Sequence, residues 1–190
     1  MLTSGTSELL GSAVTYALAG AGMVRPPLLS CPTPCPGWVV EELLDHLSDS
    51  IRVLAAAITA RSVSVVPGCH RPTGDPVARL RIRAAGLLDA VAAAGASGRR
   101  VAVGGRELTV NMVAMAASVE IAVHGWDIWV ACGGGQPVPP GLASILLPIA
   151  PLLITPDTRP GLFGHPVQLS GPACPGDQLV AFLGRQPHLT

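Results

Sequence analysis

The sequence contains no lysine, and this absence limits the partners that the protein can have. All twelve of its basic residues are arginines scattered along 190 residues, and twelve Asp and Glu side chains balance them to a formal net charge of +0. Proteins that bind nucleic acid through the phosphate backbone carry a dense basic stripe or patch. This sequence has no such stripe, so we do not expect a nucleic-acid partner.

Long hydrophobic runs are also missing, although the mean hydropathy of +0.50 is high. The longest apolar run, Leu142 to Ile154, is shorter than a bilayer-spanning helix and contains Pro148 and Pro151. The other apolar stretches carry Glu, Asp or His. We therefore expect a protein that does not span a membrane, and a homodimer in which a second subunit covers the excess apolar surface.

The five cysteines are an odd number, and the sequence does not start with the charged and apolar segments of a signal peptide. These features favour reduced thiols and a cytoplasmic location. Cys31 and Cys35 form a C-x3-C pair, but no second pair at zinc-finger spacing completes a set of four ligands. We expect this pair to belong to a loop and not to a zinc site.

A chain of 190 residues can bury a sizeable core without disulfides or metals, and we expect one domain over residues 1–190. Apolar periodicity and Pro or Gly punctuation predict helices joined by loops. The predicted helices are Ser7–Val24, Val39–Ala60, Asp75–Ala94, Val110–Cys132, Pro139–Leu153 and Asp177–Leu183. Alternation around a Gly-Gly turn predicts a β-hairpin over Arg100–Thr109, and Pro166–Leu169 is a candidate strand.

The helix predicted over Val110–Cys132 is informative because it is apolar on every side, and such a helix is normally buried. Its polar exceptions are Glu120, His124 and Asp127, at positions i, i+4 and i+7, which lie on one stripe of the helix surface. An unpaired buried carboxylate costs several kcal/mol. We therefore expect these side chains to be paired, neutralised or bound to a metal.

His46 raises the same question on the second predicted helix, where it shares the apolar arc with Val39 and Leu43. Two facing helices that supply His46, Glu120 and His124 would offer three nitrogen and oxygen ligands, the number found at open catalytic zinc sites. The spacing alone leaves simpler interpretations open. A backbone carbonyl could satisfy a buried His, and Glu and His at i, i+4 could hydrogen-bond each other.

Three segments resemble a known family. Thr33–Leu47 resembles the early signature of the DinB-like superfamily, in the actinobacterial branch that contains mycothiol-dependent maleylpyruvate isomerase. Glu120–Asp127 is similar to the second signature, and Asp177–Pro187 is similar to the tail common in that branch. The resemblance implies a mainly α fold, a DinB-like up-and-down four-helix bundle with a short β-hairpin and a small C-terminal appendage.

The resemblance also implies a divalent metal ion, expected to be zinc, between the helices. In the relatives the ligands are the His of the first signature and the Glu and His of the second, which fall on His46, Glu120 and His124. Asp127 follows at the usual place in the family, and we assign it a catalytic role in orienting a ligand imidazole or a bound water. A helix cap or an Arg partner is the alternative role for this carboxylate.

A metal with three protein ligands leaves a position open for water or for the sulfur of a thiol, which coordination deprotonates. Together with the resemblance, this predicts an enzyme that transfers the low-molecular-weight thiol mycothiol to a small electrophilic metabolite, or isomerises one. Two alternatives stay open: a thiol-independent isomerase, hydrolase or cyclase of specialised metabolism, and a non-catalytic small-molecule-binding module. Arg83, Arg106 and Arg159 could each hold a substrate carboxylate, and no motif distinguishes them.

The remaining histidines carry weaker signals. His70 lies in a stretch of Pro and Gly and is more typical of a solvated loop than of a fourth metal ligand, and His165 and His188 are weaker candidates still. We expect Trp38 and Trp126 to pack between helices.

Overall fold

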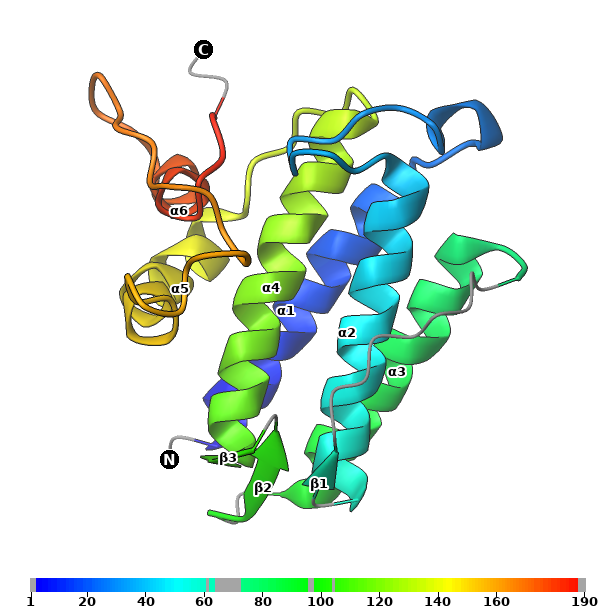
Figure 1. Cartoon of the computed structure of the whole chain (residues 1–190), viewed down its shortest axis with the longest axis vertical. Helices are drawn as coiled ribbons and strands as arrows, with labels where there is room; N and C mark the ends of the chain where they lie inside the picture. The colour runs from blue at the N-terminus through cyan, green and yellow to red at the C-terminus, as the bar shows by residue number, and fades with distance from the viewer. Residues whose placement is uncertain (1–2, 61, 64–72, 96–97, 104, 188–190) are drawn as a thin grey trace.

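The computed structural model describes residues 3–60, 62–63, 73–95, 98–103 and 105–187. Its long helices are α1 (Thr3–Ala21), α2 (Val40–Ala60), α3 (Pro76–Ala94) and α4 (Val110–Ala131). Helix α1 packs along α4, α2 packs along α3, and α2 also contacts α4 (Figure 1). The predicted mainly helical, DinB-like bundle is confirmed.

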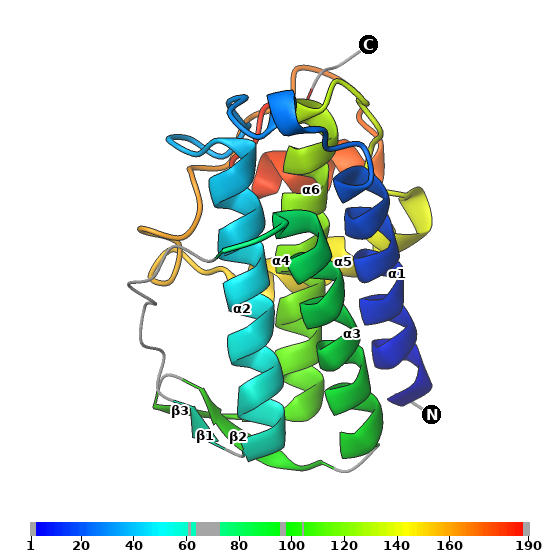
Figure 2. The ribbon, with the colours of Figure 1, turned by 90° about the vertical axis from the view of Figure 1, so that its right-hand side faces the viewer.

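Helices α2 and α3 run in the same direction, opposite to α1 and α4 (Figure 1), so successive helices do not alternate strictly as the expected up-and-down order implied. A small sheet at one end of the bundle agrees with this arrangement (Figure 2). Strand β1 (Ser62–Val63) follows α2 and pairs in parallel with β2 (Arg100–Val103), which follows α3. Strand β2 then pairs antiparallel with β3 (Arg106–Thr109), so the predicted hairpin is confirmed.

Side-chain caps explain where the bundle helices begin. The backbone N–H of Val39 donates to Glu42 Oε2 at 3.1 Å, ahead of α2. Oδ1 of Asp75 accepts from the N–H of Val77, the second residue of α3, at 2.9 Å. Oγ1 of Thr109 accepts from the N–H of Met112, the third residue of α4, at 3.2 Å. Helix α1 ends at Ala21, three residues before its predicted end at Val24, and a short 3-10 helix, η1 (Pro26–Leu28), follows.

Helix α4 is the central element of the core, because buried residues lie on all of its sides. Its Gly125 permits a close approach of α1, since a Cβ there would lie 3.0 Å from the Cα of Ala17. Among the described helices only α4 is long and apolar enough to cross a bilayer, and 72% of its apolar window is buried. Such burial is consistent with a core helix of a soluble protein.

The C-terminal appendage consists of α5 (Pro140–Leu153) and α6 (Pro175–Phe182), which pack against each other beside α4 (Figures 1 and 2). The strand predicted over Pro166–Leu169 is wrong, because these residues form no strand. One backbone hydrogen bond, from the N–H of Val167 to the carbonyl of Ala181 at 2.9 Å, holds the segment against α6. The acceptor carbonyl belongs to α6, so the hydrogen-bond ladder of a β-sheet cannot extend from it.

The turn after α6 fits closely against a neighbouring loop, and two glycines test this contact. Gly184 has φ +83°, and a Cβ there would lie 2.8 Å from backbone atoms of Gly164. Gly133, which follows α4, has φ +74° and nothing within 4 Å of its Cβ position.

We predict that Gly133→Ala costs about 1 kcal/mol of unfolding free energy through backbone strain alone. Gly184→Ala should cost roughly 2–4 kcal/mol, because overpacking adds to the strain. Urea unfolding measures both changes, and equal losses would contradict the close fit.

Candidate metal centre

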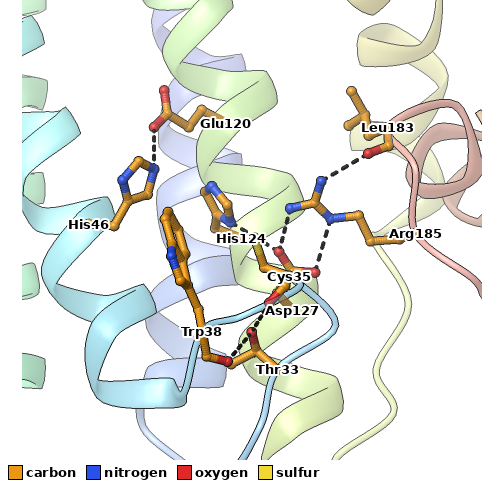
Figure 3. Close-up of polar contacts among 9 residues, drawn as sticks. All are labelled: Thr33, Cys35, Trp38, His46, Glu120, His124, Asp127, Leu183 and Arg185. Atoms are coloured by element: carbon orange, nitrogen blue, oxygen red, sulfur yellow. Dashed lines mark hydrogen bonds and ion pairs between the residues drawn. The ribbon is translucent and has the colours of Figure 1, made fainter. Parts of the chain in front are cut away.

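His46 from α2 faces Glu120 and His124 from α4 (Figure 3). Nε2 of His46 lies 3.4 Å from Oε1 of Glu120, and the two imidazole centroids are 5.2 Å apart. One possible ligand atom from each of the three residues lies within 4.8 Å of the other two. The two helices therefore bring together the three residues that the sequence identified as candidate ligands.

The cluster is buried on one side and open on the other. His124 is 6% exposed, whereas the side chains of His46 and Glu120 are 37% and 29% exposed. The open side faces a cavity of about 590 Å³. Besides the cluster, its walls include Cys35, Pro36, Trp38, Ser50, Gly161, Leu162, Phe163, Gly164 and Arg185. A small molecule can therefore reach Glu120 and the imidazoles from this cavity.

Asp127 forms a hydrogen bond with His124, and Arg185 in turn forms hydrogen bonds with Asp127. Nδ1 of His124 lies 3.0 Å from Oδ2 of Asp127. Arg185 donates from Nη2 to the same oxygen at 2.9 Å and from Nε to Oδ1 at 3.2 Å. Asp127 is fully buried and Arg185 is 4% exposed. An ionised carboxylate only accepts hydrogen bonds, so Nδ1 of His124 is the donor in this contact and Nε2 is the nitrogen left to face a ligand.

The two carboxyl groups of α4 have lowered pKa values. Burial raises the pKa of Glu120, but a hydrogen bond from His46, the charge of nearby His124 and a hydrogen bond from Ser50 outweigh it. Burial likewise raises the pKa of Asp127, and the hydrogen bond from His124 and the charge of Arg185 outweigh it. Both groups are therefore ionised at neutral pH, which is the charge state that a metal ligand or its support needs.

A tight turn before α2 places Trp38 on the wall of the cavity. The hydroxyl of Thr33 donates to the carbonyls of Trp38 and Cys35 at 3.0 and 3.1 Å, and Gly37 supplies the positive φ that the turn needs. The Trp38 ring centroid then lies 4.4 Å from that of His46. We expected this ring to pack between helices; it packs against the core and also lies against a candidate ligand.

Cys35 forms a second possible ligand group with His124 and Asp127, whose atoms also lie within 4.8 Å of one another. Burial raises the pKa of the Cys35 thiol, and the opposing influence of Arg185 does not offset it, while Asp127 raises it further. The thiol is therefore neutral at pH 7. Among the described residues, Cys31 belongs to neither of the two possible ligand groups.

The sequence pattern did not identify Arg185 as a site residue. It lies 58 positions after Asp127, so no helical spacing connects the two. The only signal for it was the likeness of residues 177–187 to the tail of the family. His165 lies on the wall of a neighbouring cavity and outside the cluster. His70 and His188 lie outside the described residues.

Comparison with known proteins identifies the family of the chain. The profile of the mycothiol maleylpyruvate isomerase N-terminal domain matches residues 12–129. The chain belongs to this family. The matched segment of the chain contains His46, Glu120, His124 and Asp127, but not Arg185.

Two relatives from Mycobacterium tuberculosis, one from strain CDC 1551 / Oshkosh and one from strain ATCC 25618 / H37Rv, are described as uncharacterized proteins. Each is 29% identical over 164 residues, which cover 85% of this chain and 87% of the relative. No solved structure matches the chain.

The buried ion pair gives a testable stability cycle. Arg185→Met leaves the Asp127 carboxylate buried without its cation, and Asp127→Asn leaves the guanidinium without its anion. Each should cost about 3–5 kcal/mol of unfolding free energy. The double variant should cost clearly less than the sum, because it leaves no unpaired charge.

An exposed pair serves as the control for this cycle. Nε of Arg100 lies 3.0 Å from Oε2 of Glu107, and the two side chains are 62% and 71% exposed. Arg100→Met should therefore cost less than about 1 kcal/mol of unfolding free energy. Additive losses in the Asp127 and Arg185 cycle, measured by urea unfolding, would show that the two residues are not coupled.

Proposed function

We propose that this chain is a metal-dependent enzyme in which His46, Glu120 and His124 hold a divalent ion, with zinc as the expected metal. The convergence of one ligand atom from each residue within 4.8 Å carries this proposal. The fit of His124 supports it, because Asp127 engages Nδ1 and leaves Nε2 available. Two nitrogens and one oxygen suit zinc, and three protein ligands are the usual number at open catalytic zinc sites.

We infer from family membership that the second substrate is a low-molecular-weight thiol, mycothiol. The proposed reaction transfers this thiol to a small electrophilic metabolite or isomerises one. A bound divalent ion would lower the pKa of a thiol or water that it coordinates. Asp127 keeps the His124 imidazole in the tautomer that can bind the ion, and Arg185 holds the Asp127 carboxylate in place.

The cavity supports a small-molecule substrate. Its volume of about 590 Å³ lies in the range of small-molecule sites. The Trp38 ring lies beside both imidazoles, with its centroid 4.4 Å from that of His46 and 6.1 Å from that of His124. Phe163 and Leu162 add apolar wall to the cavity. An electrophile and a thiol would therefore meet beside apolar side chains.

The setting is part of the same proposal. Cys31, Cys35, Cys132 and Cys174 are free thiols, which suits a reducing cytoplasm. A homodimer remains the expected assembly, because large apolar side chains such as Ile82, Leu152 and Leu162 are exposed by 71%, 79% and 70%.

Metal analysis tests the site directly. We expect about one zinc per chain in the wild type and much less in His46→Ala, Glu120→Ala and His124→Ala, because each removes a ligand. His165→Ala removes an imidazole outside the cluster and should keep the full metal content. Elemental analysis and a competition titration with a coloured chelator give content and affinity. Substoichiometric metal in the wild type would contradict the proposal and favour a binding module.

Thiol dependence tests the reaction. With the metal-loaded protein, mycothiol and an electrophile such as a maleyl compound should be consumed together in transfer, whereas isomerisation should need the thiol without consuming it. His46→Ala should abolish either activity. Turnover that persists without any thiol would assign the cavity to a thiol-independent enzyme. Failure of mycothiol to bind the metal-loaded protein in a calorimetric titration would remove it from the proposal.

A further inference from the structure

A second cavity, of about 640 Å³, lies beside the metal cavity, between the end of α5 and the loop that leads to α6. Gly161, Phe163 and Gly164 line both cavities, so this short turn is a shared wall. Much of the remaining wall is apolar and includes Ile154 and the ring of Phe182. The proposed function does not use this space.

Arg159 is the buried cation of the second cavity. It is 8% exposed, and its Nη1 donates to the carbonyls of Gly164 and Phe182 at 2.7 and 3.0 Å. Its guanidinium carbon lies 4.8 Å from the centre of the Phe182 ring. These partners are neutral. They orient the guanidinium but do not balance its charge.

The charge of Arg159 has no acidic partner among the described residues. Burial lowers the pKa of this guanidinium, and no nearby carboxylate acts against that effect. Arg185, by contrast, is equally buried but is paired with Asp127. A buried cation without an anion is costly, so its persistence here indicates a place for an anionic ligand.

The donors that Arg159 keeps free point to where such an anion would bind. Nε and Nη2 have no hydrogen-bond partner among the described residues, and neither is among the fully buried polar atoms. Since Arg159 lines the second cavity, these donors are accessible from it. Two adjacent N–H donors of a guanidinium match the two oxygens of a carboxylate. The sequence left Arg83, Arg106 and Arg159 equal as carboxylate partners; the first two are exposed, and only Arg159 lines a cavity wall.

We propose that the second cavity binds an apolar organic acid, with its carboxylate on Arg159 and its apolar body against Phe163 and Phe182. Apart from His165, Arg159 is the one ionisable side chain among the described lining residues, and its single charge matches a ligand with one carboxylate. The aromatic and proline-rich walls match a hydrocarbon body and would not solvate a phosphate. The site involves none of the candidate metal ligands, so it does not depend on the proposed function.

A matched pair of probes tests the site. 4-Phenylbutyrate and its neutral amide, 4-phenylbutyramide, differ in charge but hardly in shape. Isothermal titration of the full chain should show the acid binding at least about tenfold more tightly than the amide, because only the acid forms a charge-assisted bond to Arg159. Equal affinities, or no binding of the acid at millimolar concentration, would overturn the proposal.

Variants then locate the binding. Arg159→Gln keeps a side-chain donor for the carbonyls of Gly164 and Phe182 and removes the charge, so it should weaken the acid about tenfold and leave the amide unchanged. Arg106→Gln makes the same change on an exposed residue and should alter neither probe. Unchanged binding of the acid to Arg159→Gln would overturn the proposal. If that variant does not fold, the contrast between acid and amide on the wild type still decides.

His46→Ala separates this inference from the proposed function. The acid should bind His46→Ala and chelator-treated wild type as tightly as it binds the metal-loaded protein. Loss of binding in His46→Ala would place the probe in the metal cavity and overturn the second site. Retained binding together with a failed metal analysis would leave the second site intact while removing the metal centre.

Discussion

The buried contact between Asp127 and Arg185 joins the helical bundle to its C-terminal appendage. Asp127 belongs to α4 and Arg185 follows α6, and their side chains meet through two hydrogen bonds of 2.9 and 3.2 Å. The same carboxylate accepts from His124, so a candidate ligand, its supporting anion and the cation that balances it form one continuous chain. The geometry of the centre therefore depends on how the appendage packs against α4. Breaking the pair would affect stability and the position of the His124 imidazole together.

Helix α4 packs closely against α1 on one face and carries polar side chains on another. Its face toward α1 needs small residues, and Gly125 there allows the two backbones to approach closely. Its face toward α2 carries Glu120 and His124, which are polar and sit at the edge of a cavity. Because α4 is packed on all its other sides, these two side chains start from a rigid backbone. A centre built on a loop would lack this precision.

Local patterns predicted much of the fold and part of the centre. Apolar periodicity and Pro or Gly punctuation located α2, α3 and α4 to within a few residues, because these signals act over one or two turns. The stripe of Glu120, His124 and Asp127 follows from spacing alone. The apolar arc of α2 made His46 a candidate partner, and the family resemblance strengthened it, since no short-range rule states which side of α2 faces which side of α4.

The parts that sequence could not predict are contacts between distant segments. Strand β1 has two residues, too few for a pattern, and it exists because α2 and α3 end side by side. The alternation in Pro166–Leu169 suggested a strand, but the neighbouring backbone is a helix end that offers one acceptor. The position of Trp38 depends on a turn held by Thr33. The sequence predicts that the chain turns there, but not which residue the Trp38 ring will contact after the turn.

The shared wall between the two cavities is the feature in which these long-range contacts meet. Gly164 accepts a hydrogen bond from Arg159 on one side and lies against Gly184 on the other. Gly184 is followed directly by Arg185, which fixes Asp127 and through it His124. Each step in this path is a backbone contact or a hydrogen bond. An anion held by Arg159 would therefore bind beside the same turn that supports the candidate metal centre, and the two cavities share their structural support even though they share no candidate ligand.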